Sequence, residues 1–190
     1  MQLQPVPRVA PLVTDVTGAG PATVPRPDAA PPHPAALPRL RIRRLGPQDR
    51  AALADHFIDL SPRDRRTRFG GNASEATIEQ HCETLDFGET VCFAALDPAG
   101  SVIGAALGFR YGHGRQFAEV AVSVAAQYRR RGLGTDLATR VCDAVSASGA
   151  DAVVFEFDPS NAAIVGLVRQ IGGLVVPCAE SCTIPLSTRH

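Results

Sequence analysis

The chain has 190 residues, enough for one domain with a hydrophobic core and a tail. Its 19 basic and 19 acidic side chains give a formal net charge of zero at pH 7, so overall charge offers no reason to expect binding to nucleic acid or to a membrane surface. Every basic residue other than histidine is arginine, which excludes a Walker-type phosphate loop, because that loop requires a glycine–lysine pair.

The cysteines and histidines do not indicate a metal site. The five cysteines, an odd number at irregular spacing, contain no Cys-x-x-Cys pair, and the five histidines form no pair at ligand spacing. Free thiols are typical of a reducing cytoplasm. The sequence also contains no apolar run of membrane-spanning length and no charged-then-apolar leader pattern. We therefore expect a cytoplasmic protein without a bound metal.

The N-terminal segment, residues 1–38, differs in composition from the rest of the chain. It holds ten of the sixteen prolines and only four charged side chains. Runs such as Pro31-Pro32-His33-Pro34 favour extended polyproline conformations that bury little surface. We expect a disordered tail or linker here, followed by a single folded domain over residues 39–190.

The first half of this domain is predicted to contain an edge strand, then helices, then consecutive strands. Apolar side chains alternate with arginine around residues 40–42, which indicates a short edge strand. The Ser61-Pro62 pair is typical of a helix start. The helices predicted from caps and apolar spacing begin at Pro47, at Pro62 and near Glu75. Three strands separated by turn residues are predicted over residues 91–96, 102–110 and 117–125.

The second half is predicted to alternate between helix and strand. Apolar side chains recur every four residues from Leu133 to Val145 and predict an amphipathic helix that ends at Gly149. The remaining predicted elements are a strand over 152–157, a helix begun by Asn161, and two short strands around 174–176 and 182–184. This order predicts an α/β domain with a mixed, mostly antiparallel central sheet of about six to seven strands, flanked by about four helices.

The segment between the third of the consecutive strands and the amphipathic helix is the most informative part of the sequence. It reads Arg129-Arg130-Arg131-Gly132-Leu133-Gly134-Thr135. Two glycines separated by one residue let backbone N–H groups come close to a ligand, and the first turn of a helix favours an anion. Three arginines at a helix start oppose the helix dipole unless something negative binds. We therefore predict a pyrophosphate-binding loop that acts mainly through backbone N–H groups.

On these residues the sequence resembles the GNAT superfamily of acetyl-CoA-dependent N-acetyltransferases, over roughly residues 39–186. The family's pyrophosphate signature, Gln/Arg-x-x-Gly-x-Gly/Ala, is matched by residues 129–134, with a strand before it and an amphipathic helix after it. Within the superfamily the chain looks like the bacterial Pat-type protein lysine acetyltransferases. Leu60-Ser61-Pro62 and Arg68-Phe69 match their LSP…RF segment, and Ala118-Glu119 matches the start of their fourth strand.

The resemblance implies a GNAT-like fold, acetyl-CoA as cosubstrate, and a primary amine such as a protein lysine as the acceptor, which attacks directly in a ternary complex. It implies that Glu119 is the general base. It also implies that backbone groups of Val122 and Val124 meet the pantetheine arm and that Asn161 contacts the cofactor. Many relatives carry a tyrosine general acid where this chain has Val168. The thiol then leaves as thiolate, which a reference pKa of about 8.5 permits, or takes its proton from another group.

A physical argument for Glu119 stands beside the resemblance. An alkylamine with a pKa of about 10.4 is mostly protonated at pH 7 and cannot attack until a base removes its proton. A carboxylate at the start of a buried strand, next to the cofactor loop, is suited to that role. The alternatives for Glu119 are an exposed strand residue without function, or an ion pair with Arg110 or Arg115.

Other interpretations stay open at this stage. Asn161 can be a helix cap, and Val122 and Val124 can be core residues. The domain can be a non-catalytic acyl-CoA-binding regulatory module, or a GNAT enzyme that acts on a small-molecule amine. A dinucleotide-binding oxidoreductase is disfavoured, because Leu137 occupies the third glycine position of G-x-G-x-x-G. These patterns fix neither the acceptor amine nor the oligomeric state.

Overall fold

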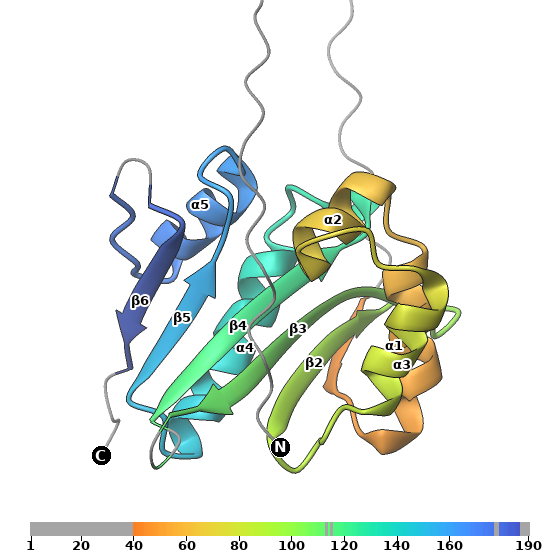
Figure 1. Cartoon of the computed structure of the whole chain (residues 1–190), viewed down its shortest axis with the longest axis horizontal. Coiled ribbons are helices and arrows are strands. Elements are labelled where there is room, and N and C mark those ends of the chain that lie inside the picture. Colours follow the sequence, from red (N-terminus) through yellow and green to blue (C-terminus); the bar gives the residue numbers. More distant parts are fainter. Residues whose placement is uncertain (1–39, 113, 115, 177–178, 187–190) are drawn as a thin grey trace, which may run out of the picture. The chain divides into compact units, whose positions relative to one another are not determined.

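A six-stranded sheet in the order β1-β2-β3-β4-β5-β6 organises the computed structural model, which describes residues 40–112, 114, 116–176 and 179–186 (Figure 1). Neighbouring strands are antiparallel except for β4 and β5, which run in the same direction. The predicted mixed, mostly antiparallel sheet is therefore confirmed, while the proline-rich tail lies outside the described residues. The strands are β1 (Arg41–Arg44), β2 (Thr90–Leu96), β3 (Val102–Tyr111), β4 (Phe117–Val124), β5 (Ala152–Glu156) and β6 (Ser181–Pro185).

The described residues form five α-helices, in agreement with the approximate number expected, and Ser61 caps the eight-residue helix α2. The Ser61 hydroxyl accepts a hydrogen bond from the Asp64 N–H, and Pro62 is the first helical residue, as predicted. The helices are η1 (Pro47–Asp49), α1 (Arg50–Ile58), α2 (Pro62–Phe69), α3 (Glu75–Glu83), η3 (Ala126–Tyr128), α4 (Leu133–Ala147) and α5 (Ala162–Gln170).

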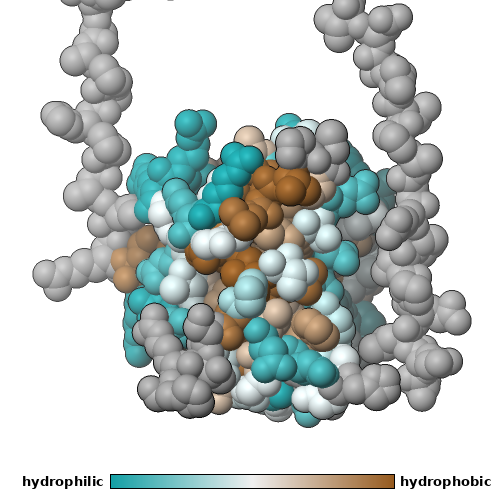
Figure 2. Space-filling view, turned by 90° about the vertical axis from the view of Figure 1, so that its left-hand side faces the viewer, coloured by the Kyte–Doolittle hydropathy of each residue, from teal (hydrophilic) through white to brown (hydrophobic). Residues whose placement is uncertain are grey.

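One predicted strand is wrong. Residues 174–176 pair with no strand of the sheet, and Leu174 and Val176 remain 91% and 63% exposed. A short apolar run with no partner strand gains no ladder hydrogen bonds. Apolar surface is visible on the side of the molecule where α5 and β6 lie (Figure 2).

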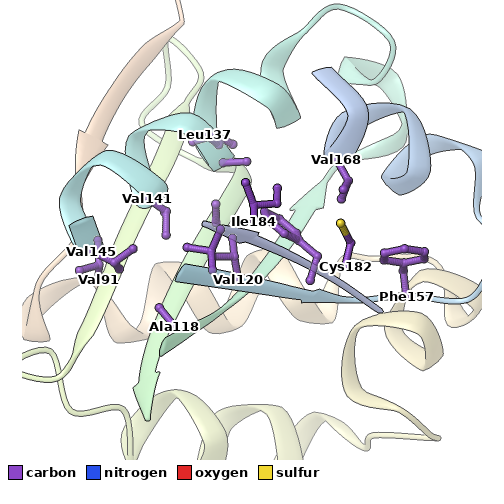
Figure 3. Packing of buried hydrophobic residues seen from close by; sticks show 14 of the residues in the cluster. Val91, Ala118, Val120, Leu137, Val141, Val145, Phe157, Val168, Cys182 and Ile184 are labelled. Atoms are coloured by element: carbon purple, nitrogen blue, oxygen red, sulfur yellow. The ribbon is translucent and has the colours of Figure 1, made fainter. Parts of the chain in front are cut away.

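The two faces of the sheet are covered by different helices. The apolar side of α4 packs on one face, where Val141, Val145 and Leu137 join buried strand residues (Figure 3). On the opposite face, α1 and α3 cover a second cluster that includes Phe57 and Ile78. Side chains alternate between faces along each strand. The sequence of β4 therefore distributes its side chains between these two environments.

Gly108 is a point of very close approach between β3 and α4. A Cβ atom at this position would lie 2.7 Å from a Cγ atom of Val141 and 2.9 Å from one of Val145. Both valines are fully buried, so they cannot move away freely. We expect Gly108→Ala to lower the free energy of unfolding by about 2 kcal/mol, as overpacking does in tight cores. Urea denaturation at pH 7 measures this change.

Gly166→Ala provides the matched control for this prediction. Gly166 lies inside α5, and a Cβ atom there would meet nothing within 4 Å. Alanine is the better helix former by about 0.5–1 kcal/mol, so this variant should be as stable as the parent or more so. Equal destabilisation by the two substitutions would show that contact with α4 is not the cause.

Candidate active site

Strands β4 and β5 pair only at their beginnings, and the last paired residues are Glu119 and Val154. The Ala125 N–H donates to a carbonyl of β3 at 2.9 Å, so antiparallel alternation directs the odd-numbered backbone groups of β4 toward β3. The N–H and C=O groups of Val122 and Val124 therefore point away from β3, beyond the last pair with β5. Their side chains pack against the cluster under α4, so core packing and an open backbone edge coexist.

The loop before α4 has the backbone geometry of an anion cradle. Arg130 has φ +60° and Gly132 has φ +79°, two left-handed conformations within three residues. Gly132 is the N-cap of α4, no side chain caps the helix, and the first intrahelical bond runs from the Asp136 N–H to the Gly132 carbonyl. The N–H groups of residues 133–135 therefore lie at a helix start without a side-chain acceptor. Such groups, with the helix dipole, attract anions.

The side chains of this loop have different surroundings. The Arg129 Nε donates to the Val124 carbonyl at 2.7 Å, and its Nη2 lies 2.8 Å from Asp64, which joins the loop to β4 and α2. Although burial opposes it, the hydrogen bonds from Arg129 and Ser61 hold the pKa of Asp64 below its usual value. The Thr135 hydroxyl donates to Gln170 of α5 at 2.7 Å, whereas Arg130 and Arg131 are exposed. The side chains of Arg129 and Thr135 thus link the loop to the neighbouring elements β4, α2 and α5.

Glu119 lies on the face of β4 opposite α4, together with its β3 partner Phe109. The side chain is exposed to solvent at the point where β4 and β5 stop pairing. Partial burial and then the charge of Glu156 raise the pKa of Glu119 above its usual value, whereas Arg68 lowers it. Alternation along β3 places Arg110 on the other face, which disfavours the predicted alternative of an ion pair between Glu119 and this arginine. Arg115 lies outside the described residues.

Two further polar side chains share this face with Glu119, and sequence analysis did not find them. Glu156 ends β5, two residues beyond the partner of Glu119. Tyr111 ends β3 and is 45% exposed; partial burial, then Glu119 and Glu156, raise its pKa. Only strand register brings these groups together, so no local pattern could have found them. Together with Glu119 they form a polar surface on this face of the sheet.

A family model described as "Acetyltransferase (GNAT) domain" matches residues 39–173. The chain belongs to the GNAT acetyltransferase family. As a member of this family, the protein is an N-acetyltransferase. No curated protein matches the chain.

Several solved structures share the GNAT fold with this chain. The GNAT domain of PAT from S. lividans has a TM-score of 0.66 and 20% identity, covering 77% of this chain and 90% of that chain. A GNAT-family acetyltransferase from Streptococcus pneumoniae has a TM-score of 0.62 and 14% identity, covering 78% and 100%. A phosphinothricin acetyltransferase from Sinorhizobium meliloti, in complex with AcCoA, has a TM-score of 0.59 and 16% identity, covering 77% and 88%. The predicted Pat-type resemblance agrees with the first of these.

Two remaining predicted positions of this GNAT domain lie on α5. The Asn161 side chain caps the helix and accepts a hydrogen bond from the Ile164 N–H at 3.4 Å. The cap uses the amide oxygen, which leaves the Asn161 NH₂ group outside it. Val168 is completely buried against Cys182 and Phe157 (Figure 3). The position that the sequence resemblance assigns to a tyrosine general acid is therefore a core position in this chain.

The described residues offer no support for two other classes of site. None of them form a group of three histidine, cysteine, aspartate or glutamate side chains that could hold a metal ion. Within the same part of the chain, no helix has the length and apolar character needed to cross a membrane.

Proposed function

We propose that this GNAT enzyme transfers an acetyl group from acetyl-CoA to a primary amine by direct attack in a ternary complex. The observation that carries the proposal is the end of β4–β5 pairing at Glu119, which sets a carboxylate beside an open backbone edge. An open strand edge can bind an extended chain as another strand would. The thioester of acetyl-CoA would then lie within reach of the same carboxylate that receives the amine.

The cosubstrate would follow the edge of β4 from its middle to the loop before α4. Backbone groups of Val122 and Val124 would hold the pantetheine arm, with Val124 acting through its N–H because its carbonyl accepts from Arg129. The N–H groups of residues 130–135 would hold the pyrophosphate. Arg130 and Arg131 would add charge near the phosphates, and the Asn161 amide would contact the cofactor across the opening. The AcCoA complex of the S. meliloti phosphinothricin acetyltransferase supports this choice of cosubstrate.

The chemistry begins with a protonated amine, because an alkylamine of pKa about 10.4 is charged at pH 7. Glu119 would remove this proton, directly or through a water molecule. The neutral amine then forms a C–N bond to the thioester carbonyl, and a backbone N–H of Val122 or Val124 would stabilise the oxyanion. Collapse breaks the C–S bond, the amide nitrogen gives up its second proton to solvent, and CoA leaves as a thiolate, which a reference pKa of about 8.5 permits without a general acid.

The acceptor is tested by following the acetyl group. We expect that isotope-labelled acetyl-CoA, incubated with the protein and a pool of protein extract, polyamines and aminoglycosides, places label on an amine detected by mass spectrometry. Label on protein lysines would support a Pat-type function, and label on a small amine would support transfer with a different acceptor. A parallel titration with acetyl-CoA measures binding without chemistry.

The alternative of a non-catalytic acyl-CoA-binding module is disfavoured by membership of the acetyltransferase family. Its expected result in the same experiment is binding of acetyl-CoA with no label on any amine.

The four described cysteines are unpaired, which supports our further proposal that the protein works in a reducing cytoplasm.

A further inference from the structure

Arg68, near the end of α2, lies against two aromatic rings. Its guanidinium carbon lies 5.1 Å from the ring centroid of Phe57 and 5.2 Å from that of Phe69. The Nε and Nη2 atoms are buried, and neither has a hydrogen-bond partner among the described residues. Ring faces attract a cation, but a buried charge without a counter-ion is costly. The position of this charge therefore needs an explanation beyond packing.

The aromatic side chains around Arg68 connect it to the strand that carries Glu119. The ring of His81 in α3 lies 5.5 Å from that of Phe69 and 6.4 Å from that of Phe109. Phe109 is the residue of β3 directly opposite Glu119. α2 also contacts β4. Arg68 and Glu119 thus lie on the same face of the sheet.

Arg68 is the positive charge that acts on Glu119 from the surrounding elements. From β5, Glu156 acts with a negative charge. Tyr111 of β3 is neutral at pH 7, because its pKa is raised. His81 of α3 is mostly neutral, because burial and then Arg68 lower its pKa. His56 of α1 is also neutral at pH 7, because burial lowers its pKa.

Glu119 in turn affects the pKa of Arg68. Burial lowers the pKa of the Arg68 guanidinium, and Glu119 is the first of the groups that oppose this effect. No ion pair joins the two side chains within 4.0 Å in the described part of the chain. A positive charge beyond ion-pair distance favours the carboxylate form of Glu119 without occupying the carboxylate oxygens.

We propose that Arg68 is a positioning residue that keeps Glu119 in its carboxylate form while leaving both carboxylate oxygens free to take the proton of the acceptor amine. This inference rests on the proposed role of Glu119 as the base. A direct ion pair would hold the carboxylate more strongly but would compete with the incoming amine for its oxygens. A cation that forms no ion pair with the carboxylate avoids that competition.

The test is the pH profile of kcat/KM at saturating acetyl-CoA, with the acceptor found by labelling. Arg68→Met removes the charge, so Glu119 should hold its proton to higher pH. We expect kcat/KM to fall about tenfold more at pH 6 than at pH 8.5, and Arg68→Lys to restore most of the difference. Arg66→Met is the matched control, because Arg66 is exposed on the same helix; it should leave the profile unchanged.

A loss of the same size at every pH in Arg68→Met would overturn the proposal in favour of a packing or acceptor-binding role, and so would an unchanged profile. Arg68→Gln is the second uncharged variant if Arg68→Met fails to fold, which circular dichroism detects. NMR titration of ¹³C-labelled glutamate carboxylates, assigned with Glu119→Gln, provides a readout that needs no activity. The Glu119 resonance should titrate at higher pH in the uncharged variant.

The two proposals fail in different ways. If Glu119→Gln stays active, the proposed base is wrong, whatever the titration of Glu119 shows. If Glu119→Gln is inactive but the Glu119 resonance titrates at the same pH with and without the Arg68 charge, the base assignment survives and the role of Arg68 is wrong.

Discussion

Glu119→Gln is expected to lower kcat/KM at pH 7 by about 10²- to 10⁴-fold, the range that general-base catalysis contributes. Glutamine preserves the shape of the side chain but cannot accept a proton. Binding of acetyl-CoA should be unchanged, because the backbone groups of Val122, Val124 and the loop before α4 are untouched. Steady-state kinetics gives the first quantity and calorimetric titration the second.

The defect should also depend on pH in a definite direction. A free alkylamine loses its own proton near pH 10.4, so raising the pH supplies the neutral nucleophile without a base. The ratio of parent to variant activity should therefore shrink between pH 7 and pH 10. A ratio that stays constant would indicate that Glu119 acts through structure and not through proton transfer.

Glu156→Gln is the matched comparison, since it makes the same chemical change on the same face of the sheet. Glu156 raises the pKa of Glu119, so its removal should move the acid limb of kcat/KM to lower pH. The loss at pH 7 should be much smaller than that of Glu119→Gln. A larger loss in Glu156→Gln would assign the base to Glu156 instead.

Much of the fold follows from local patterns that tertiary contacts do not override. Ser61 and Pro62 start α2 because a hydroxyl cap and a fixed φ act within four residues of sequence. The glycines of the pyrophosphate loop are also local, since Gly132 takes the left-handed conformation at the N-cap of α4. The strand predicted at residues 174–176 is wrong because this run pairs with no strand of the sheet, and apolar composition alone does not determine pairing.

The surroundings of the candidate site were less predictable than its motif. Glu119 could be chosen from the family pattern, but Glu156, Tyr111 and Arg68 reach its face through strand register and the packing of α2. The sequence pattern suggested that Arg129 belongs with the phosphates, yet its guanidinium binds Asp64 and the Val124 carbonyl. A long side chain such as that of Arg129 has several possible partners within reach, and sequence spacing does not show which of them it binds.

The second large effect concerns stability in acid. His56 of α1 is buried, with its Nε2 atom 2.8 Å from the Ser123 hydroxyl oxygen of β4. This hydrogen bond joins α1 to β4 in the neutral state of the ring. Burial lowers the pKa of His56 from 6.5 to about 4. Protonation therefore requires the folded chain to hold a charge between α1 and the sheet.

The sign of the effect follows from proton binding. Between pH 6.5 and about 4 the unfolded chain binds a proton at His56 that the folded chain does not bind, so stability falls as the pH falls through this window. The contribution is fully present above pH 6.5, and about 2 kcal/mol of it is lost at pH 5 and about 3 kcal/mol below pH 4. Urea denaturation at pH 7 and pH 5 measures the difference.

His56→Gln removes this titrating group and should flatten the dependence by about 2 kcal/mol between pH 7 and pH 5, even though the variant loses packing at both pH values. His81→Gln is the matched control, because burial also lowers the pKa of His81, but its ring is less deeply buried and the flattening should be smaller. If the parent and His56→Gln lose equal stability between pH 7 and pH 5, His56 is not the group through which acid weakens the contact between α1 and β4.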